Sequence, residues 1–145
     1  MPRVLVDLNL VLDVLLAREP HVEASAALWA LCERGEAEGL LAAHSVPTLH
    51  YLARRARGPE FARDCVRDVL AVFGVARVDA HVLRDAAALG WSDFEDAVCA
   101  AAALHAGCDL IATRDPVGFR ASPLPALDPL AARVALELAA QGAPR

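Results

Sequence analysis

The chain has 145 residues, a length typical of one domain that buries its own core without disulfides or structural metals. It is 57% hydrophobic and carries a formal net charge of −5, so the molecule as a whole does not attract nucleic acid electrostatically. No apolar stretch is long enough to cross a bilayer, and Asp7 interrupts the N-terminal apolar run, which argues against a signal peptide. We therefore expect a single cytoplasmic domain over residues 1–145, with no membrane association.

The expected elements alternate between strand-length apolar runs and helix-length amphipathic stretches. In chain order they are a strand over 3–7, helices over 9–18 and 21–34, a strand over 39–45, helices over 46–57 and 59–73, a strand over 75–79, helices over 80–89 and 93–106, a strand over 109–113, and a final short strand and helix over 125–142. This alternation predicts an α/β fold with three layers, α/β/α, around a central parallel sheet.

The four cysteines show no CxxC spacing. Cys99, His105 and Cys108 are a conceivable set of metal ligands, but Cys99 and Cys108 flank a predicted helix rather than a tight turn. We therefore interpret all four cysteines as buried, reduced thiols.

Carboxylates collect where apolar elements begin or end. Asp7 ends the first strand and Asp115 follows the strand over 109–113, so both are expected at one edge of the sheet, where parallel sheets bind ligands. Asp93 and Asp96 share a stripe of the helix over 93–106 with small and apolar residues, a face expected to pack on the sheet. A carboxylate buried there is costly unless a cation compensates it, and the chain contains no lysine.

Each acid also has an ordinary structural explanation. Asp7 or Asn9 is placed to cap the following helix. Ser92 fits the N-cap of the helix over 93–106, and Ser92-x-x-Glu95 has the capping-box spacing, which we prefer as the role of Glu95. For three acids at one edge, however, this explanation requires three coincidences. We favour a divalent metal site, and the oxygen-only ligands favour Mg²⁺ or Mn²⁺ over zinc.

Three segments carry the chemistry-bearing residues: Asp7-Leu8-Asn9, the stretch over 93–97, and Thr113-Arg114-Asp115 followed by Phe119. Together they resemble the PIN domain, the metal-dependent ribonuclease fold of many toxins from VapBC-type toxin–antitoxin systems. Asp7-Leu8-Asn9 resembles the opening acid-x-Asn of the family. The segment Asp93-Phe94-Glu95-Asp96-Ala97 is similar to the DFEDA pattern of one PIN subgroup. Thr113-Arg114-Asp115, followed by Phe119, is similar to the family's characteristic strand end. The similarity covers nearly the whole chain.

The resemblance implies an activity as well as a fold: hydrolysis of RNA phosphodiester bonds, with a water activated by Mg²⁺ or Mn²⁺. It implies, by position, a set of catalytic metal ligands: Asp7, Asp96 and Asp115, with Asp93 as an additional ligand or a supporting acid. Asn9 and Thr113 would orient these ligands through hydrogen bonds. The resemblance further implies a homodimer and a small antitoxin protein as a partner.

The sequence departs from the family at two points. Many PIN nucleases have a Glu on the helix that spans 46–57 here, but this stretch contains no acid, and only His44, Thr48 and Tyr51 are placed to face the site. Gly118 stands where the subgroup commonly has Asp, so Asp115 would serve instead. The alternative is therefore a catalytically degenerate PIN-like domain that binds RNA or protein.

Two further interpretations concern single features. Arg54, Arg55 and Arg57, with Arg63 and Arg67 on the next helix, form the densest basic region, which is either a solvated face or a track for RNA phosphates. Asp7-x-Asn9 after a buried strand also loosely resembles the haloacid-dehalogenase-like phosphatases. Those enzymes need a second Asp and a later Lys, which this chain lacks.

Overall fold

The computed structural model describes residues 1–142. Within these residues five strands form one sheet: β1 (Arg3–Val6), β2 (Glu38–Ala42), β3 (Gly74–Ala76), β4 (Leu110–Ala112) and β5 (Ala126–Leu127). Their order is β3-β2-β1-β4-β5, and every neighbouring pair is parallel. The predicted α/β class is therefore confirmed.

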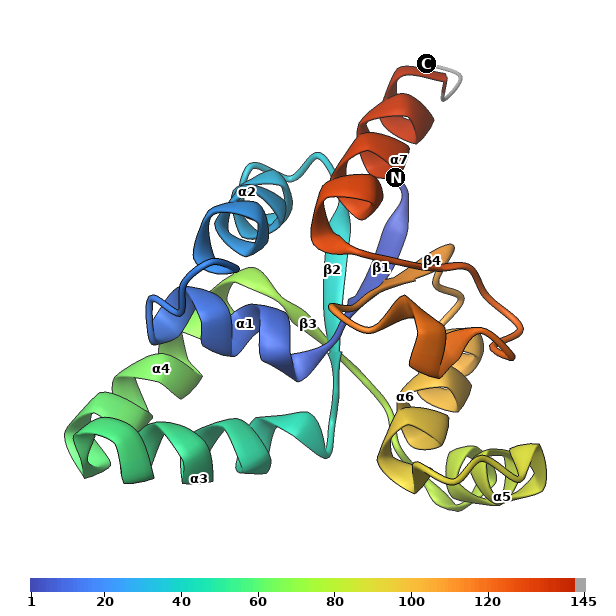
Figure 1. Ribbon diagram of the computed structural model, residues 1–145, viewed down its shortest axis with the longest axis horizontal. Helices are drawn as coiled ribbons and strands as arrows, with labels where there is room; N and C mark the ends of the chain where they lie inside the picture. The colour runs from blue at the N-terminus through green and yellow to red at the C-terminus, as the bar shows by residue number, and fades with distance from the viewer. Residues whose placement is uncertain (143–145) are drawn as a thin grey trace.

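Helices cover both faces of this sheet (Figure 1). They are α1 (Leu8–Leu15), α2 (Val22–Glu33), α3 (Ser45–Arg57), α4 (Pro59–Val72), α5 (Ala80–Leu89), α6 (Phe94–His105), the short 3₁₀ helix η1 (Pro116–Phe119) and α7 (Pro129–Gly142). One face packs against α1, α2 and α7, with the α3–α4 pair beside them, and the other face packs against α5 and α6. The predicted three-layer arrangement is thus confirmed.

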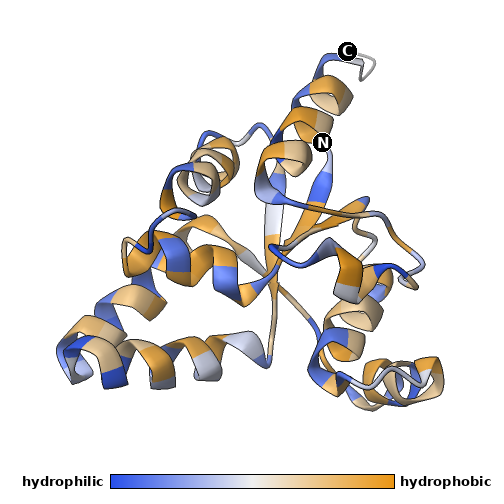
Figure 2. Ribbon diagram, viewed as in Figure 1, coloured by the Kyte–Doolittle hydropathy of each residue, from blue (hydrophilic) through white to orange (hydrophobic). Residues whose placement is uncertain are grey.

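Successive residues of β1 belong to opposite layers, as the two-residue period of a strand requires. Val4 and Val6 pack with α1 and its neighbours, whereas Leu5 packs against α6. Because both faces of the sheet are covered, the strands are apolar throughout, and hydrophilic residues gather instead at the N-terminal end of α6 and the far end of α3 (Figure 2). This arrangement accounts for the high hydrophobic fraction of the sequence.

The sheet has a topological switch between β1 and β4. The chain adds β2 and β3 on one side of β1 and then returns to place β4 on the other side. Val6 pairs with Ala112, so the residues that follow, Asp7 and Thr113, lie side by side at the carboxyl ends of the two strands. Parallel sheets bind ligands at such a switch point.

The ends of several elements differ from the sequence prediction. The strand expected over 39–45 spans 38–42, because α3 already begins at Ser45 and His44 is its N-cap residue. The strand expected over 75–79 is likewise shorter, since Asp79 caps α5 by accepting a hydrogen bond from the Val82 N–H at 3.1 Å. No helix within residues 1–142 combines the length and hydrophobicity that a membrane span requires.

Candidate metal centre

Thr113 connects two of the predicted acids. Asp7 occupies the N-cap position of α1, yet its side chain makes no capping hydrogen bond. Instead Asp7 Oδ2 accepts a hydrogen bond of 2.8 Å from the Thr113 hydroxyl, whose oxygen accepts one of 3.1 Å from the Asp115 N–H. Thr113 is fully buried, so these bonds fix the Asp7 carboxylate relative to the backbone of Asp115. Helix capping does not explain the side chain of Asp7.

Asp96 and Asp115 border the same small space beside Gly118. Asp115 Oδ1 accepts a hydrogen bond of 3.2 Å from the Gly118 N–H. A Cβ added at Gly118 would lie 2.6 Å from Asp115 Oδ2 and 3.6 Å from Asp96 Oδ2. A side chain at position 118 would therefore fill the gap between these two carboxylates, and glycine keeps that gap open.

Three acids, Asp93, Glu95 and Asp96, cluster at the N-terminal end of α6. Asp93, rather than Ser92, is the N-cap residue, and its Oδ1 accepts a hydrogen bond of 3.0 Å from the Asp96 N–H. Carboxylate oxygens of Asp93, Glu95 and Asp96 lie within 4.8 Å of one another. The expected capping-box role of Glu95 is wrong, because its carboxylate contacts His44 instead.

The carboxylates of this cluster repel one another. Burial, followed by the charges of Asp93, Asp7 and Glu95, raises the pKa of Asp96 to about 7. Burial also raises the pKa of Asp7, although the hydrogen bond from Thr113 acts in the opposite direction. Among the ion pairs of residues 1–142, none involves one of the four predicted metal ligands. The charge of Arg114 lowers the pKa of Asp7 in part, but Arg114 pairs with Asp13, so the negative charge of the four acids is not neutralised by an ion pair and favours a bound cation.

The arrangement fits a small divalent cation. Asp93, Asp96 and Asp115 line an open pocket of about 500 Å³, and the cradle at Gly118 lies within it. The donors are carboxylate oxygens, the ligands that Mg²⁺ and Mn²⁺ prefer. Asp7 does not line this pocket, but its negative charge is close enough to raise the pKa of Asp96.

Next to Thr113, the side chain of Arg114 takes part in a network of ion pairs around Asp13. The sequence analysis did not predict this network. Arg114 follows Thr113, and its Nε lies 3.2 Å from Asp13 Oδ2. The Arg18 guanidinium lies 3.0 Å from the other oxygen of Asp13, and the Ser25 hydroxyl donates to Oδ2 at 3.2 Å. Asp13 is fully buried in α1. An acid on the apolar face of that helix was itself a signal, because a buried carboxylate requires partners.

Two other predictions concern residues that make no side-chain hydrogen bond to the acids within residues 1–142. Asn9 is exposed, and its side-chain oxygen accepts a hydrogen bond of 3.4 Å from Arg18. Arg54, Arg55 and Arg57 are exposed at the C-terminal end of α3, which runs away from α6 (Figure 1). The basic region thus lies about 15 Å along α3 from the end nearest the acids, at 1.5 Å per residue.

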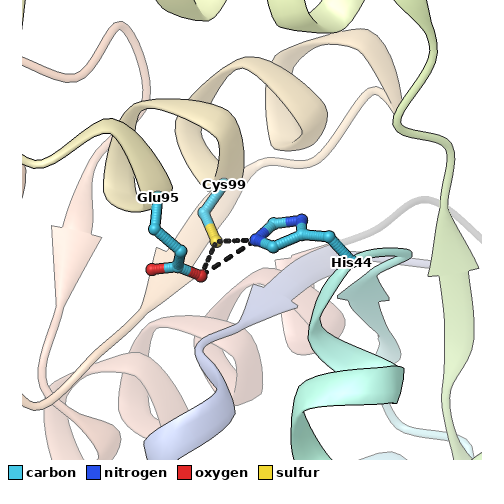
Figure 3. A group of neighbouring side chains, drawn as sticks. All are labelled: His44, Glu95 and Cys99. Atoms are coloured by element: carbon cyan, nitrogen blue, oxygen red, sulfur yellow. Dashed lines mark hydrogen bonds and ion pairs between the residues drawn. The ribbon is translucent and has the colours of Figure 1, made fainter.

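A cluster that combines three ligand types lies next to the acids, where His44, Glu95 and Cys99 point toward one another (Figure 3). The sequence analysis placed His44 near the site but gave Glu95 a capping role and Cys99 a purely structural one. Glu95 and Cys99 are four residues apart on a helix, which is a spacing that brings side chains together. The contribution of His44 depends on the tertiary fold. All four cysteines are buried and free, as predicted.

The family model of the PIN domain matches residues 3–116, and the chain belongs to the PIN domain family. This match identifies the family and not the DFEDA subgroup. Comparison with curated protein sequences finds no match.

Solved structures of other proteins share the fold. VapC20 of Mycobacterium tuberculosis, a toxin that cleaves the sarcin–ricin loop, is 21% identical, with a TM-score of 0.61 over 74% of this chain and 86% of that one. FitAcB of Neisseria gonorrhoeae is 18% identical, with a TM-score of 0.66 over 87% and 97% of the two chains. DNA-bound VapBC of Salmonella typhimurium is 15% identical, with a TM-score of 0.67 over 88% and 98%.

Proposed function

We propose that this protein is a divalent-metal-dependent ribonuclease that hydrolyses RNA phosphodiester bonds. The observation that carries the proposal is the convergence of carboxylates at the switch point of the sheet, with a cradle at Gly118 and, among the described residues, no ion pair to any of these acids. Membership of the PIN domain family supports it, as does the similarity in fold to an RNA-cleaving toxin.

In this proposal Asp7, Asp96 and Asp115 hold Mg²⁺ or Mn²⁺, with Asp93 as a further ligand. The ion activates a water as nucleophile and offsets the charge that develops on the scissile phosphate. The chain's own contribution is positioning: Thr113 fixes Asp7 and the backbone of Asp115 together, and the Gly118 N–H orients the Asp115 carboxylate. Because the pKa of Asp96 is about 7 without a cation, that residue is ready to ionise when one binds.

The replacement of Asp96 by Asn tests this mechanism. We expect Asp96→Asn to remain folded and to lose Mn²⁺-dependent cleavage of single-stranded RNA by more than the roughly 10- to 100-fold typical of losing a partner outside the ligand set. Asp68→Asn is the matched control, because Asp68 is an exposed acid on α4 that pairs with Arg67. Equal cleavage by both variants would remove Asp96 from the mechanism.

The alternative remains a degenerate PIN domain that binds RNA or protein without cleaving it. One observation favours it: the first turn of α3 carries no acid, although many PIN nucleases have a Glu on this helix. Calorimetric titration with Mn²⁺ and Mg²⁺ separates the two functions. A nuclease binds the ions and requires Asp96, whereas a degenerate domain binds neither ion.

We further propose that residues 1–145 act as one cytoplasmic domain, and that the protein is the toxin of a toxin–antitoxin pair, functions as a homodimer and binds a small antitoxin. The support is the similarity in fold to a toxin and to the VapBC and FitAcB structures. Co-expression with the product of the neighbouring short reading frame tests the pairing. Relief of toxicity and formation of a stable complex are the expected results.

A further inference from the structure

We propose that His44, Glu95 and Cys99 form a second metal site, selective for Zn²⁺, beside the oxygen-only acidic centre. His44 comes from the N-cap of α3, and Glu95 and Cys99 come from the first half of α6 (Figure 3). His44 Nε2 lies 2.9 Å from Glu95 Oε1 and 3.8 Å from Cys99 Sγ, and Cys99 Sγ lies 3.3 Å from the same Glu95 oxygen. Three different donor atoms thus form one small triangle.

The size of this triangle matches the edges of a zinc tetrahedron. Zinc lies about 2.3 Å from a thiolate sulfur and about 2.0–2.2 Å from imidazole nitrogen or carboxylate oxygen, which places neighbouring ligand atoms roughly 3.4–3.6 Å apart. The observed separations of 2.9, 3.3 and 3.8 Å differ from these values by about half an ångström or less. Small rotations of the side chains are sufficient to admit the ion.

The chemistry of the donors selects zinc over the ions of the acidic centre. A thiolate and an imidazole are soft and borderline ligands that suit Zn²⁺, whereas Mg²⁺ and Mn²⁺ prefer oxygen. Three protein ligands also leave one tetrahedral position open. Cys99 is buried but the Glu95 side chain is half exposed, so the open position faces the solvent side of the cluster.

The fold holds the ligands in place before any ion binds. Glu95 and Cys99 lie one turn apart on α6, and His44 is the N-cap residue of α3. His44 Nδ1 is buried and has no hydrogen-bond partner among the described residues, so the polar contacts of this ring are those with Glu95 and Cys99. A bound ion would therefore join α3 to α6 through the cluster.

Binding has a defined proton balance. Burial and the nearby carboxylates raise the pKa of the Cys99 thiol, so without metal the sulfur keeps its proton. Zn²⁺ binds the thiolate, so the S–H bond breaks, a Zn–S bond forms and the proton passes to water. Zn²⁺ also takes the lone pair of His44 Nε2, so the hydrogen that this nitrogen donates to Glu95 leaves it and the bound ring carries its N–H on Nδ1. The thiolate and the Glu95 carboxylate together then balance the charge of the ion.

Cobalt is the probe, because Co²⁺ occupies zinc sites and a Co²⁺–thiolate bond absorbs in the near ultraviolet. We expect Co²⁺ to produce this absorption at one equivalent in the wild-type protein, and Zn²⁺ to remove it by displacing the cobalt. Cys99→Ser should abolish the band. His44→Gln, at a less buried position, should weaken Co²⁺ affinity by roughly 100-fold or more, since even partners outside the ligand set contribute about 10- to 100-fold.

Two control variants locate the ion. Cys108→Ser removes another buried thiol, which lies beyond the C-terminal end of α6, and should leave the band unchanged. Asp115→Asn alters the acidic centre at an acid that, unlike Asp96, does not act on Glu95, and it should also keep the band. Circular dichroism checks that each variant is folded.

The proposal is overturned by any of three results: no thiolate absorption in the wild-type protein, absorption that survives Cys99→Ser, or absorption lost in folded Asp115→Asn. The first would leave a hydrogen-bonded network without a metal. None of these measurements depends on RNA cleavage, so the ribonuclease proposal and the zinc site stand or fail separately.

Discussion

The molecule contains two aspartate environments near the same edge of the sheet, and they are built in opposite ways. Asp13 is fully buried and contacts two arginines and a serine hydroxyl. Asp96 is partly exposed, has no ion-pair partner within residues 1–142, and has its pKa raised to about 7 by burial and by neighbouring acids. Asp13 is therefore paired with arginine side chains of the protein, whereas Asp96 is not.

The difference separates structural charge from functional charge. A buried acid whose charge is already paired within the protein, such as Asp13, stabilises the packing of the helices and does not need an ion from solution. An acid left among other acids weakens the fold unless an ion arrives, and proteins accept this cost chiefly at functional sites. The two aspartates differ in burial, but it is the presence or absence of cationic partners that separates their roles.

Replacing Asp13, the buried acid that pairs with two arginines, should change the stability of the protein more than any other substitution discussed below. Asp13→Asn leaves two guanidinium groups without their buried carboxylate, so we expect the free energy of unfolding to fall by about 3 kcal/mol. This change is measured by urea denaturation, with circular dichroism reporting the unfolded fraction. Asp68→Asn, which breaks an exposed pair, should change stability by less than about 0.5 kcal/mol. Equal effects of the two variants would show that the network around Asp13 adds nothing to the fold.

Asp96, the acid without an ion-pair partner, should make the free energy of unfolding depend on pH. The pKa of Asp96 is about 7 in the folded protein against an ordinary 3.8, so across this range the folded state holds a proton that the unfolded chain has released. Metal-free protein should therefore lose stability as the pH rises from about 4 to 7, by roughly 1–2 kcal/mol after allowance for solvent screening.

Comparison with Asp96→Asn isolates this contribution, because the other titrating groups remain in both proteins. The variant should show a flatter profile, and Mg²⁺ should raise the stability of the wild type above pH 7 but not that of the variant. A wild-type profile that is parallel to the variant's would show that Asp96 has an ordinary pKa.

The cradle between the acids can be filled without altering any charge. In Gly118→Ala the new methyl group meets Asp115 Oδ2 at 2.6 Å, so the carboxylate must move and Mn²⁺ affinity should fall about tenfold, or roughly 1.4 kcal/mol. Gly142→Ala is the control, because a Cβ there meets nothing within 4 Å. Calorimetric titration provides both affinities. Unchanged affinity in Gly118→Ala would place the ion away from Asp115.

The basic end of α3 should have the smallest effect, because it lies farthest from the acids. Arg54→Glu with Arg55→Glu should weaken RNA binding and lower the slope of log affinity against log salt by about 0.7 for each phosphate that the protein no longer neutralises. Binding is measured in an Asp96→Asn background to prevent cleavage. Arg34→Glu, at an exposed arginine elsewhere, is the control. Equal weakening by both changes would indicate a general charge effect and favour the solvated face.

The sequence predicted the order of the elements because its strands are continuously apolar and its helices are amphipathic. It placed Asp7 and Asp115 at one edge because residues that follow parallel strands meet there. It misplaced the end of β2, since Ala43 continues the apolar run of the strand but already belongs to the turn before α3.

The contacts of Glu95 and Asp13 were harder to predict. Ser92-x-x-Glu95 matches a capping pattern, and only the tertiary fold reveals that Asp93 caps the helix and that His44 arrives beside Glu95. Arg18 is close to Asp13 in the sequence, but the other partners come from α2 and from the segment after β4, which sequence spacing does not bring together. Local patterns thus predicted the backbone better than the side-chain pairing.

Helix α6 sets how far the acids reach over the sheet. Its residues 97–103 are all buried and mostly alanine, and the helix contacts four strands, β1 to β4. Substituting a larger side chain at any of these positions would push the helix outward and carry Asp96 away from Asp115. We therefore expect natural variants to tolerate few changes here, although alanine has no side-chain atom that could bind an ion. The size of the side chains at 97–103, rather than their charge, then limits which substitutions the site can accept.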